Sequence, residues 1–331
     1  MPDKKIARRL PSPSNSVNVE ANVRKGFKFQ PWAWLAFILI AAGIALAYYL
    51  LRPQYRTAGN LVGLLPRSDA VLFYADVDTL RQSGFLGRLQ GAKGLEDPEY
   101  QRFVRETGFS YERDLDALAV ASLPNQLFAT LRGKFDWRRL TEYAQHQGGS
   151  CHNTYCQVPA STHGRWLSFF PIRSGVMGLS MGPDPSAAYQ LLPRRGAPEI
   201  QTPSYTAWMT LPRRLLDDPK SLAPGAQLFA TALSSATRVT LGIDQKQSTG
   251  GQSDFMVRLT AKYDSSAKAE DAQHHLEQVT SMLKAVASRQ QQDRDAPDLT
   301  SVLSSGTFRD VNGSLEGFWP VPQQVIDSLL K

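Results

Sequence analysis

The sequence is poor in the side chains and motifs that usually mark an enzyme. Only two cysteines and five histidines occur among its 331 residues. It has no Walker phosphate loop, no dinucleotide-binding fingerprint and no His-Glu-x-x-His zinc motif. The sequence therefore predicts no catalytic residue, no cofactor and no metal ligand from motifs, and favours a protein that is not an enzyme.

Charge is absent from one long stretch, residues 31–51, which reads PWAWLAFILIAAGIALAYYLL. A helix of 21 residues, rising about 1.5 Å per residue, can span the roughly 30 Å hydrocarbon core of a bilayer. Trp32 and Trp34 lie at one end, and Tyr48 and Tyr49 at the other, where amphipathic rings suit the two membrane interfaces. The stretch predicts a single transmembrane helix anchored by these four rings, with the lipid bilayer as a partner.

The residues before this stretch indicate its orientation. Residues 1–30 carry seven Lys or Arg against two Asp or Glu and lack apolar periodicity, which predicts a disordered basic tail. Basic flanks stay in the cytoplasm, so residues 52–331 are expected outside the inner (cytoplasmic) membrane, in the periplasm or the extracellular space. A cleaved signal peptide is the competing interpretation, because positions 45–47 read Ala-Leu-Ala. The apolar run continues to Leu51, which favours an anchor.

The tail also accounts for most of the positive charge. The whole chain has a formal net charge of +7, of which the tail supplies +5. The remaining +2 argues against nucleic acid as a partner. The basic and aromatic cluster at 135–139 is better explained by a helix cap at Asp136 and packing of Trp137.

The two cysteines, Cys151 and Cys156, are separated by four residues in Cys-His-Asn-Thr-Tyr-Cys. In an exported chain they predict one disulfide that staples a local turn. Together with His163 they leave open an alternative, a thiol-redox or metal-dependent envelope enzyme. Their spacing matches no known zinc pattern. They also follow a predicted helix, whereas redox-active pairs usually form Cys-x-x-Cys at a helix N-terminus.

The exported part alternates strands and helices in an order that recurs. Predicted strands occupy 71–77, 115–122, 126–135, 165–172, 175–181, 205–211, 237–246, 254–263, 307–311 and 314–319. Asp97-Pro98 and Gly108 are start and stop signals for a helix over 97–108. Further helices are predicted at 136–146 and 264–290.

An internal repeat supports this order. Residues 131–147 align without a gap with 259–275, and seven of the 17 positions are identical. We predict an α+β fold: a juxtamembrane linker at 52–60, then repeats at 61–195 and 196–331, each a mostly antiparallel sheet with helices packed on one face. Whether the repeats form one sheet or two domains stays open.

Two side-chain patterns have alternative interpretations. Ala272, Leu276, Val279, Leu283 and Val286 make a narrow apolar seam along the last long helix. The seam packs on its own sheet, or it meets a helix of another envelope protein or of a second copy.

Asp76 and Asp78 are paired carboxylates two residues apart, expected on one face of the first strand. Such a pair can perform acid–base chemistry. Solvated charges at a strand end are the simpler interpretation, because the second repeat has Met209 and Leu211 nearby instead.

The chain resembles bacterial exported proteins of uncharacterised function that have one N-terminal transmembrane helix and a duplicated α+β domain. The resemblance spans roughly residues 61–192 and rests on the motifs at 65–66, 73–77, 97–100, 107–109, 114–116 and 133–136. It implies no activity and no catalytic residue. We therefore expect a non-enzymatic, single-pass membrane protein whose extracytoplasmic part binds or scaffolds another envelope component.

Overall fold

A computed structural model describes residues 57–88, 97–193, 200–218, 224–247, 253–290, 299–322 and 325. The basic tail, the predicted membrane helix at 31–51 and its anchors Trp32, Trp34, Tyr48 and Tyr49 lie outside these described residues. Within the described ranges, no helix combines the length and the apolar character needed to cross a bilayer.

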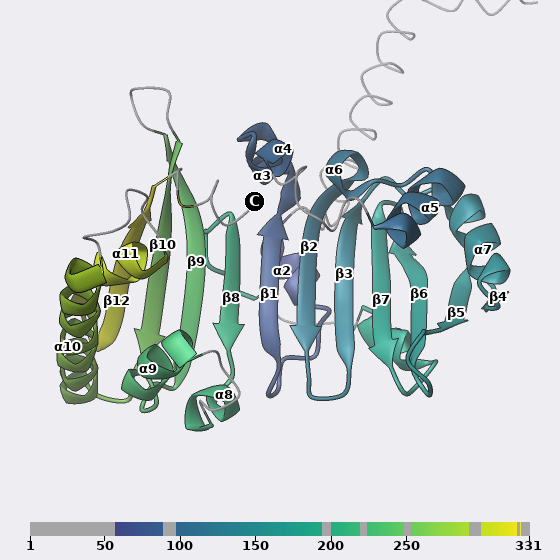
Figure 1. The fold of residues 1–331 in the computed structure, drawn as a ribbon. Helices are drawn as coiled ribbons and strands as arrows, with labels where there is room; N and C mark the ends of the chain where they lie inside the picture. The colour runs from purple at the N-terminus through teal and green to yellow at the C-terminus, as the bar shows by residue number, and fades with distance from the viewer. Residues whose placement is uncertain are drawn as a thin grey trace, which may run out of the picture. The chain divides into compact units, whose positions relative to one another are not determined.

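All described strands belong to one antiparallel sheet of 12 strands (Figure 1). Their order across the sheet is β11-β12-β10-β9-β8-β1-β2-β3-β7-β6-β5-β4. The strands are β1 (Val71–Asp76), β2 (Leu115–Ser122), β3 (Leu127–Gly133), β4 (Ser150–His152), β5 (Tyr155–Pro159), β6 (Trp166–Arg173), β7 (Val176–Gly182), β8 (Ala207–Leu211), β9 (Arg238–Gln247), β10 (Ser253–Lys262), β11 (Thr307–Val311) and β12 (Ser314–Val321).

The helices connect these strands. They are α2 (Ala58–Val62), α3 (Val77–Gln82), α4 (Phe85–Arg88), α5 (Pro98–Thr107), α6 (Tyr111–Asp114), α7 (Trp137–His146), the 3₁₀ helix η3 (Ala187–Leu191), α8 (Arg213–Asp217), α9 (Pro224–Ala232), α10 (Ser266–Gln290) and α11 (Leu299–Ser304). The predicted mixed α+β fold with a large antiparallel sheet is confirmed.

Aspartate caps begin several of these helices, as the sequence indicates. The Asp97 carboxylate accepts a hydrogen bond from the Glu99 amide at 2.8 Å, and the Asp136 carboxylate accepts one from the Arg139 amide at 3.2 Å. Gly108 ends α5 with a φ of 72°, a left-handed conformation that glycine adopts without a Cβ penalty.

The strands of the two predicted repeats lie in the two halves of a single sheet. Read outward from the centre, the first half has the order β1-β2-β3-β7-β6, and the second half has β8-β9-β10-β12-β11. The halves meet where β1 pairs with β8, and Tyr74 there lies directly opposite Trp208. Their rings stack with centroids 5.9 Å apart. The first half continues beyond its fifth strand with β5 and β4, which have no counterpart among the described strands of the second half.

The prediction that helices cover one face is only partly correct. Most helices, including α3, α7 and α10, pack on the face of the sheet that carries Ala75, Leu131 and Leu259. However, α2 and η3 pack on the opposite face, against the side chains around Tyr74 and Trp208. A sheet this wide has two large faces. Helices α2 and η3, which lie before and after the strands of the first half, cover part of the face opposite to α3, α7 and α10.

Of the predicted linker at 52–60, the structure describes residues 57–60, and the last three of them belong to a helix. Helix α2 already begins at Ala58, and its Leu61 and Val62 are fully buried. The hydroxyl of Thr130 on β3 donates to the Leu61 carbonyl at 3.1 Å. The folded body therefore includes residues from Thr57 onward.

Candidate functional site

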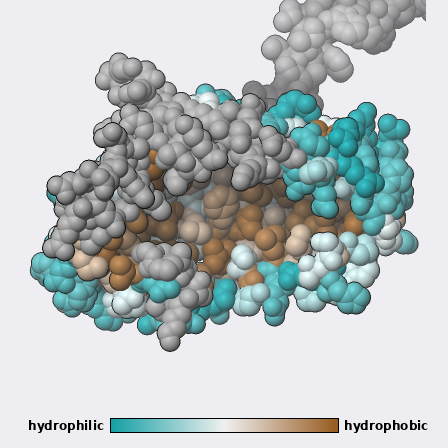
Figure 2. All heavy atoms as spheres, viewed as in Figure 1, coloured by the Kyte–Doolittle hydropathy of each residue, from teal (hydrophilic) through white to brown (hydrophobic). Residues whose placement is uncertain are grey.

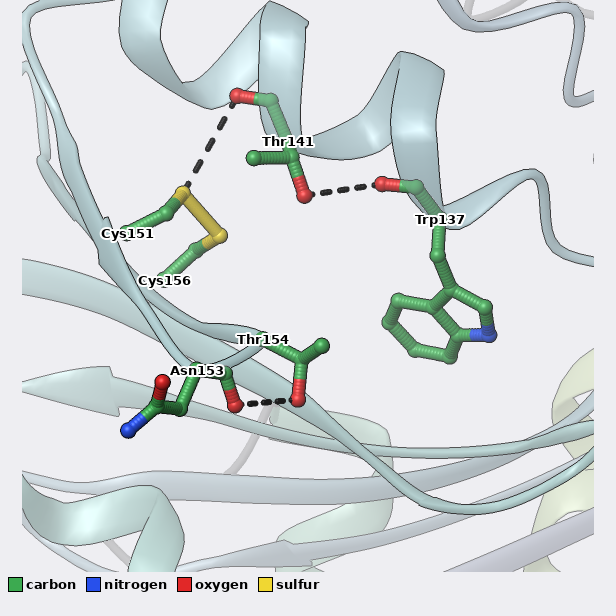
Figure 3. Close-up of a disulfide and its surroundings, with 6 residues drawn as sticks. All are labelled: Trp137, Thr141, Cys151, Asn153, Thr154 and Cys156. Carbon is green, nitrogen blue, oxygen red and sulfur yellow. Dashed lines mark hydrogen bonds between the residues drawn. A yellow bond between two sulfur atoms is a disulfide. The ribbon is translucent and has the colours of Figure 1, made fainter. Parts of the chain in front are cut away.

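The predicted disulfide is present and belongs to a β-hairpin. Cys151 on β4 and Cys156 on β5 lie opposite each other and are bonded (Figure 3). Asn153 and Thr154 form the connecting turn with φ angles of 47° and 71°, as a two-residue type I′ hairpin requires. The sequence predicted only a turn here, because each strand is short and polar side chains interrupt it.

The disulfide packs against the hydrophobic core of the first half. Cys156 is fully buried in a cluster with Leu140 of α7 and Phe169 of β6, and the carbonyl oxygen of Thr141 lies 3.9 Å from the Cys151 sulfur. His163 is exposed on the loop between β5 and β6. In the part of the chain that the structure describes, no three His, Cys, Asp or Glu side chains gather where they could hold a metal ion. With both sulfurs bonded, neither is a free thiolate ligand.

The paired carboxylates have local roles. Asp76 ends β1 and caps α3 by accepting a hydrogen bond from the Thr79 amide at 3.1 Å. Asp78 lies inside α3, not on the strand as predicted, and forms an ion pair with Arg81 at 2.8 Å. The two carboxylates thus serve different partners at the start of one helix.

The apolar seam of α10 packs inward where the structure describes its side chains. Ala272 and Leu276 are buried in the core of the second half, with Leu259 and Leu315 of the sheet. Val279 and Leu283 are half-buried, and the side chain of Val286 lies outside the described residues. This packing matches the intramolecular alternative for the seam.

A different surface stands out on the helix-covered face of the sheet, at its centre. The register places Leu241, Met209, Phe73, Val120, Ala129 and Leu179 in one row across β9, β8, β1, β2, β3 and β7. A second row, two residues further along β1, contains Ile243, Ala207, Ala75, Leu118, Leu131 and Met177. A third contains Val71, Ser122, Leu127 and Met181. Every side chain in these rows is apolar except that of Ser122.

Three large side chains at separate points of these rows are open to solvent, whereas the small side chains of Ala75, Ala129 and Ala207 are buried. Phe73, Met181 and Ile243 are 36%, 38% and 40% exposed, although they are large apolar side chains. Figure 2 shows apolar residues gathered in a hollow over the central strands. We call this surface the central groove and define it by Phe73, Val120, Leu127, Met181, Met209 and Ile243; none of these six belongs to the four core clusters found among the described residues.

Helices border the central groove on three sides. Leu216 of α8 and Phe229 of α9 pack over the β9 side, and Leu140 of α7 packs over the β7 side. Leu86 of α4 packs over Ala75 and Ala207. Among the described residues, no helix side chain shares a core cluster with Phe73, Val120 or Met209 on β1, β2 and β8.

The opposite face of the second half shows how this chain builds a sheet face that meets water. Arg258 pairs with Asp244 at 3.7 Å, and Arg309 pairs with Glu316 at 2.6 Å. The Arg258 and Arg309 guanidinium groups lie 5.5 and 4.8 Å from the Phe318 ring centroid. Charged side chains alternate with apolar ones there, as expected for a solvated face. The central groove lacks this alternation.

The first residues of β1 carry a sequence signal for this site that motif searches miss. The strand begins Val71-Leu72-Phe73-Tyr74-Ala75, an unbroken apolar run. Such runs are typical of strands covered on both faces, whereas a strand with one solvated face alternates. Tyr74 is buried on one face, but Phe73 is open on the other. The composition of β1 is therefore that of a strand buried on both faces, although Phe73 is exposed on one of them.

The chemistry of the central groove is that of binding. Its six defining side chains include no acid, base, nucleophile or metal ligand. An apolar surface of this kind gains free energy when an apolar partner displaces water from it, by about 25 cal/mol per Å² covered. Exposed apolar patches on soluble domains usually mark ligand grooves or interfaces.

Comparisons with known proteins add little to this geometry. No protein-family model matches the sequence, and no curated protein matches it. Among solved structures, crystal form III of TP0453 is similar with a TM-score of 0.44 and 9% identity, over 82% of this chain and 97% of that one. Crystal form I of TP0453 has a TM-score of 0.44 and 10% identity, over 82% and 96%. Similarity this remote carries no argument about function.

Proposed function

We propose that the protein is a single-pass, membrane-anchored binding module of the bacterial envelope and that it binds its partner in the central groove. The observation that carries this proposal is an apolar, half-open surface at the middle of the sheet, whose six defining side chains lie outside the four core clusters of the described residues. The charge-free stretch at 31–51 and the basic tail support an anchor with the body outside the cytoplasm. The disulfide agrees with an oxidising compartment.

The topology can be tested directly on the full chain. Alkaline phosphatase fused after Lys331 should be active in cells, whereas a fusion after Gln30 should be inactive, because the enzyme needs an oxidising compartment. Carbonate extraction should leave the protein in the membrane. Equal activity of both fusions, or release by carbonate, contradicts the anchor.

Binding in the central groove calls for a probe placed within it. We would replace Phe73 by p-benzoylphenylalanine in the full chain, irradiate living cells and identify what becomes attached. The matched control is the same replacement at Phe318, which is half-buried on the opposite face of the sheet. We expect an irradiation-dependent adduct from position 73 and little from position 318. No adduct from position 73, or equal adducts from both, contradicts binding in the groove.

The competing proposal is an envelope enzyme that uses Cys151, Cys156 and His163. The same cell experiment addresses it when Cys151 and Cys156 are both changed to Ala. A binding module keeps its adduct at position 73 after this change. Loss of the adduct together with loss of a metal-dependent or thiol-dependent activity would favour the enzyme.

A further inference from the structure

We infer that the central groove holds a hydrocarbon chain of a membrane lipid. This inference rests on the proposed function, because it uses the membrane anchor. It goes further by naming the chemical class of the ligand.

The lining of the groove fits hydrocarbon. Phe73, Val120 and Leu127 offer only carbon surface, and the two methionines, Met181 and Met209, add flexible thioethers. Methionine side chains adapt to apolar ligands of irregular shape. In the three rows of the floor, Ser122 is the single polar side chain, so the floor offers no charged group to select a peptide, a sugar or a phosphate.

Small side chains bound the open part of the floor. Ala75 and Ala207 lie opposite each other at the β1–β8 junction and are buried in one cluster with Leu86 of α4, and Ala129, next to Val120 in the adjoining row, is also buried. Four strands span about 14 Å between the first and last, at roughly 4.8 Å per step. The row that carries Met209, Phe73 and Val120 is therefore wide enough for one or more extended acyl chains, and also for one helix of about 10 Å diameter.

Between an acyl chain and a helix, the short segment that connects the predicted membrane helix to the folded body favours the acyl chain. Only residues 52–56 separate the predicted membrane helix from Thr57. Even fully extended, they reach about 20 Å, at no more than roughly 3.6 Å per residue. Helix α2 begins at Ala58 with buried side chains, so it supplies no further slack. A body tethered so closely meets bilayer lipid at a higher local concentration than an apolar ligand dissolved in the aqueous compartment.

The test uses the full chain in vesicles of phosphatidylethanolamine and phosphatidylglycerol that contain a trace of phosphatidylcholine with a diazirine on its acyl chain. After irradiation, tryptic peptides carrying lipid mass are identified. The peptide 68–81 contains Phe73, and the segment 31–51 serves as an internal reference for membrane insertion. We expect label on both.

Variants connect the label to the groove. Phe73→Glu and, independently, Met181→Gln should each lower groove labelling at least fivefold without changing the label on 31–51. The matched control is Met282→Glu, because Met282 is 56% exposed on α10, away from the groove residues. It should label like the unchanged protein. Retention of the Cys151–Cys156 disulfide and an unchanged near-ultraviolet circular dichroism spectrum verify folding.

The outcomes separate the inference from the proposal beneath it. Label on 31–51 but not on 68–81 overturns the lipid assignment and leaves the anchor standing. Label on 68–81 alone supports hydrocarbon binding and contradicts the anchor, and no label on either overturns both. If p-benzoylphenylalanine at position 73 attaches to a protein or to a second copy of this chain and never to lipid, a helix in the groove replaces the lipid.

Discussion

Replacing both Cys151 and Cys156 by Ala should lower the stability of the folded body modestly and leave its fold intact. The two cysteines are five positions apart. In the chain-entropy description, closing so short a loop removes about 7 cal/mol/K from the unfolded chain, which corresponds to about 2 kcal/mol at 25 °C. For a domain of this size, that loss lowers Tm by roughly 4–8 °C. Alanine is chosen because a serine hydroxyl at position 156 would be buried beside Leu140 and Phe169.

The assay is thermal unfolding of the full chain in vesicles, followed by circular dichroism with and without a phosphine reductant. The unchanged protein in reductant should unfold at the temperature of the double variant, whose own Tm should not respond to reductant. A loss above about 5 kcal/mol, or a variant that fails to fold, would refute the conclusion that the bond is a local staple. Unchanged stability, with two titratable thiols in the native protein, would show that the bond does not form.

Three further predictions concern the faces of the sheet, the seam of α10 and the response to acid. With no lipid added, Phe73→Thr should lower the free energy of unfolding by less than about 1.5 kcal/mol and Tyr74→Thr by about 3–5 kcal/mol, because only Tyr74 is buried. Equal shifts of the urea midpoint at constant slope would contradict an open groove. Leu276→Ala should cost about 2–5 kcal/mol and Met282→Ala close to nothing; a small loss at Leu276 measured by the same titration would reopen a partner role for the seam. Burial raises the pKa of Asp114, but hydrogen bonds from the Arg113 guanidinium and the Ser110 amide outweigh it and hold the pKa below its usual value. The stability that Asp114 contributes is therefore present at neutral pH and lost as pH falls through that lowered pKa. Tm should fall less steeply between pH 7 and 3 in Asp114→Asn than in the unchanged protein, and parallel curves would contradict this.

Local signals in the sequence predicted the elements that depend on neighbouring residues. The Asp97 cap, the Gly108 stop and the strands predicted at 307–311 and 314–319 follow from backbone preferences that a few residues set. The alignment of 131–147 with 259–275 likewise predicted a strand that leads into a helix in both halves. The structure has β3 followed by α7, and β10 followed by α10.

The faces of the sheet were harder to predict, because they depend on contacts between distant segments. Nothing near Leu61 indicates that α2 covers β1 to β3 from the face opposite to α7. The β4–β5 hairpin was missed because two strands of three and five residues give too little periodicity. The central groove was missed for a related reason. An apolar strand residue such as Phe73 predicts burial, and only the placement of every helix shows which apolar residues stay uncovered.

The meeting of β1 and β8 has a consequence for how this protein could have arisen. The two halves present the same strand to each other in antiparallel orientation, which is the self-complementary contact of a two-fold homodimer. A single-copy ancestor would then have been a pair of identical chains with one continuous sheet, fused later by gene duplication. On that view the central groove began on a symmetry axis, with both subunits supplying its floor, and the fused chain has since been free to make its two sides different.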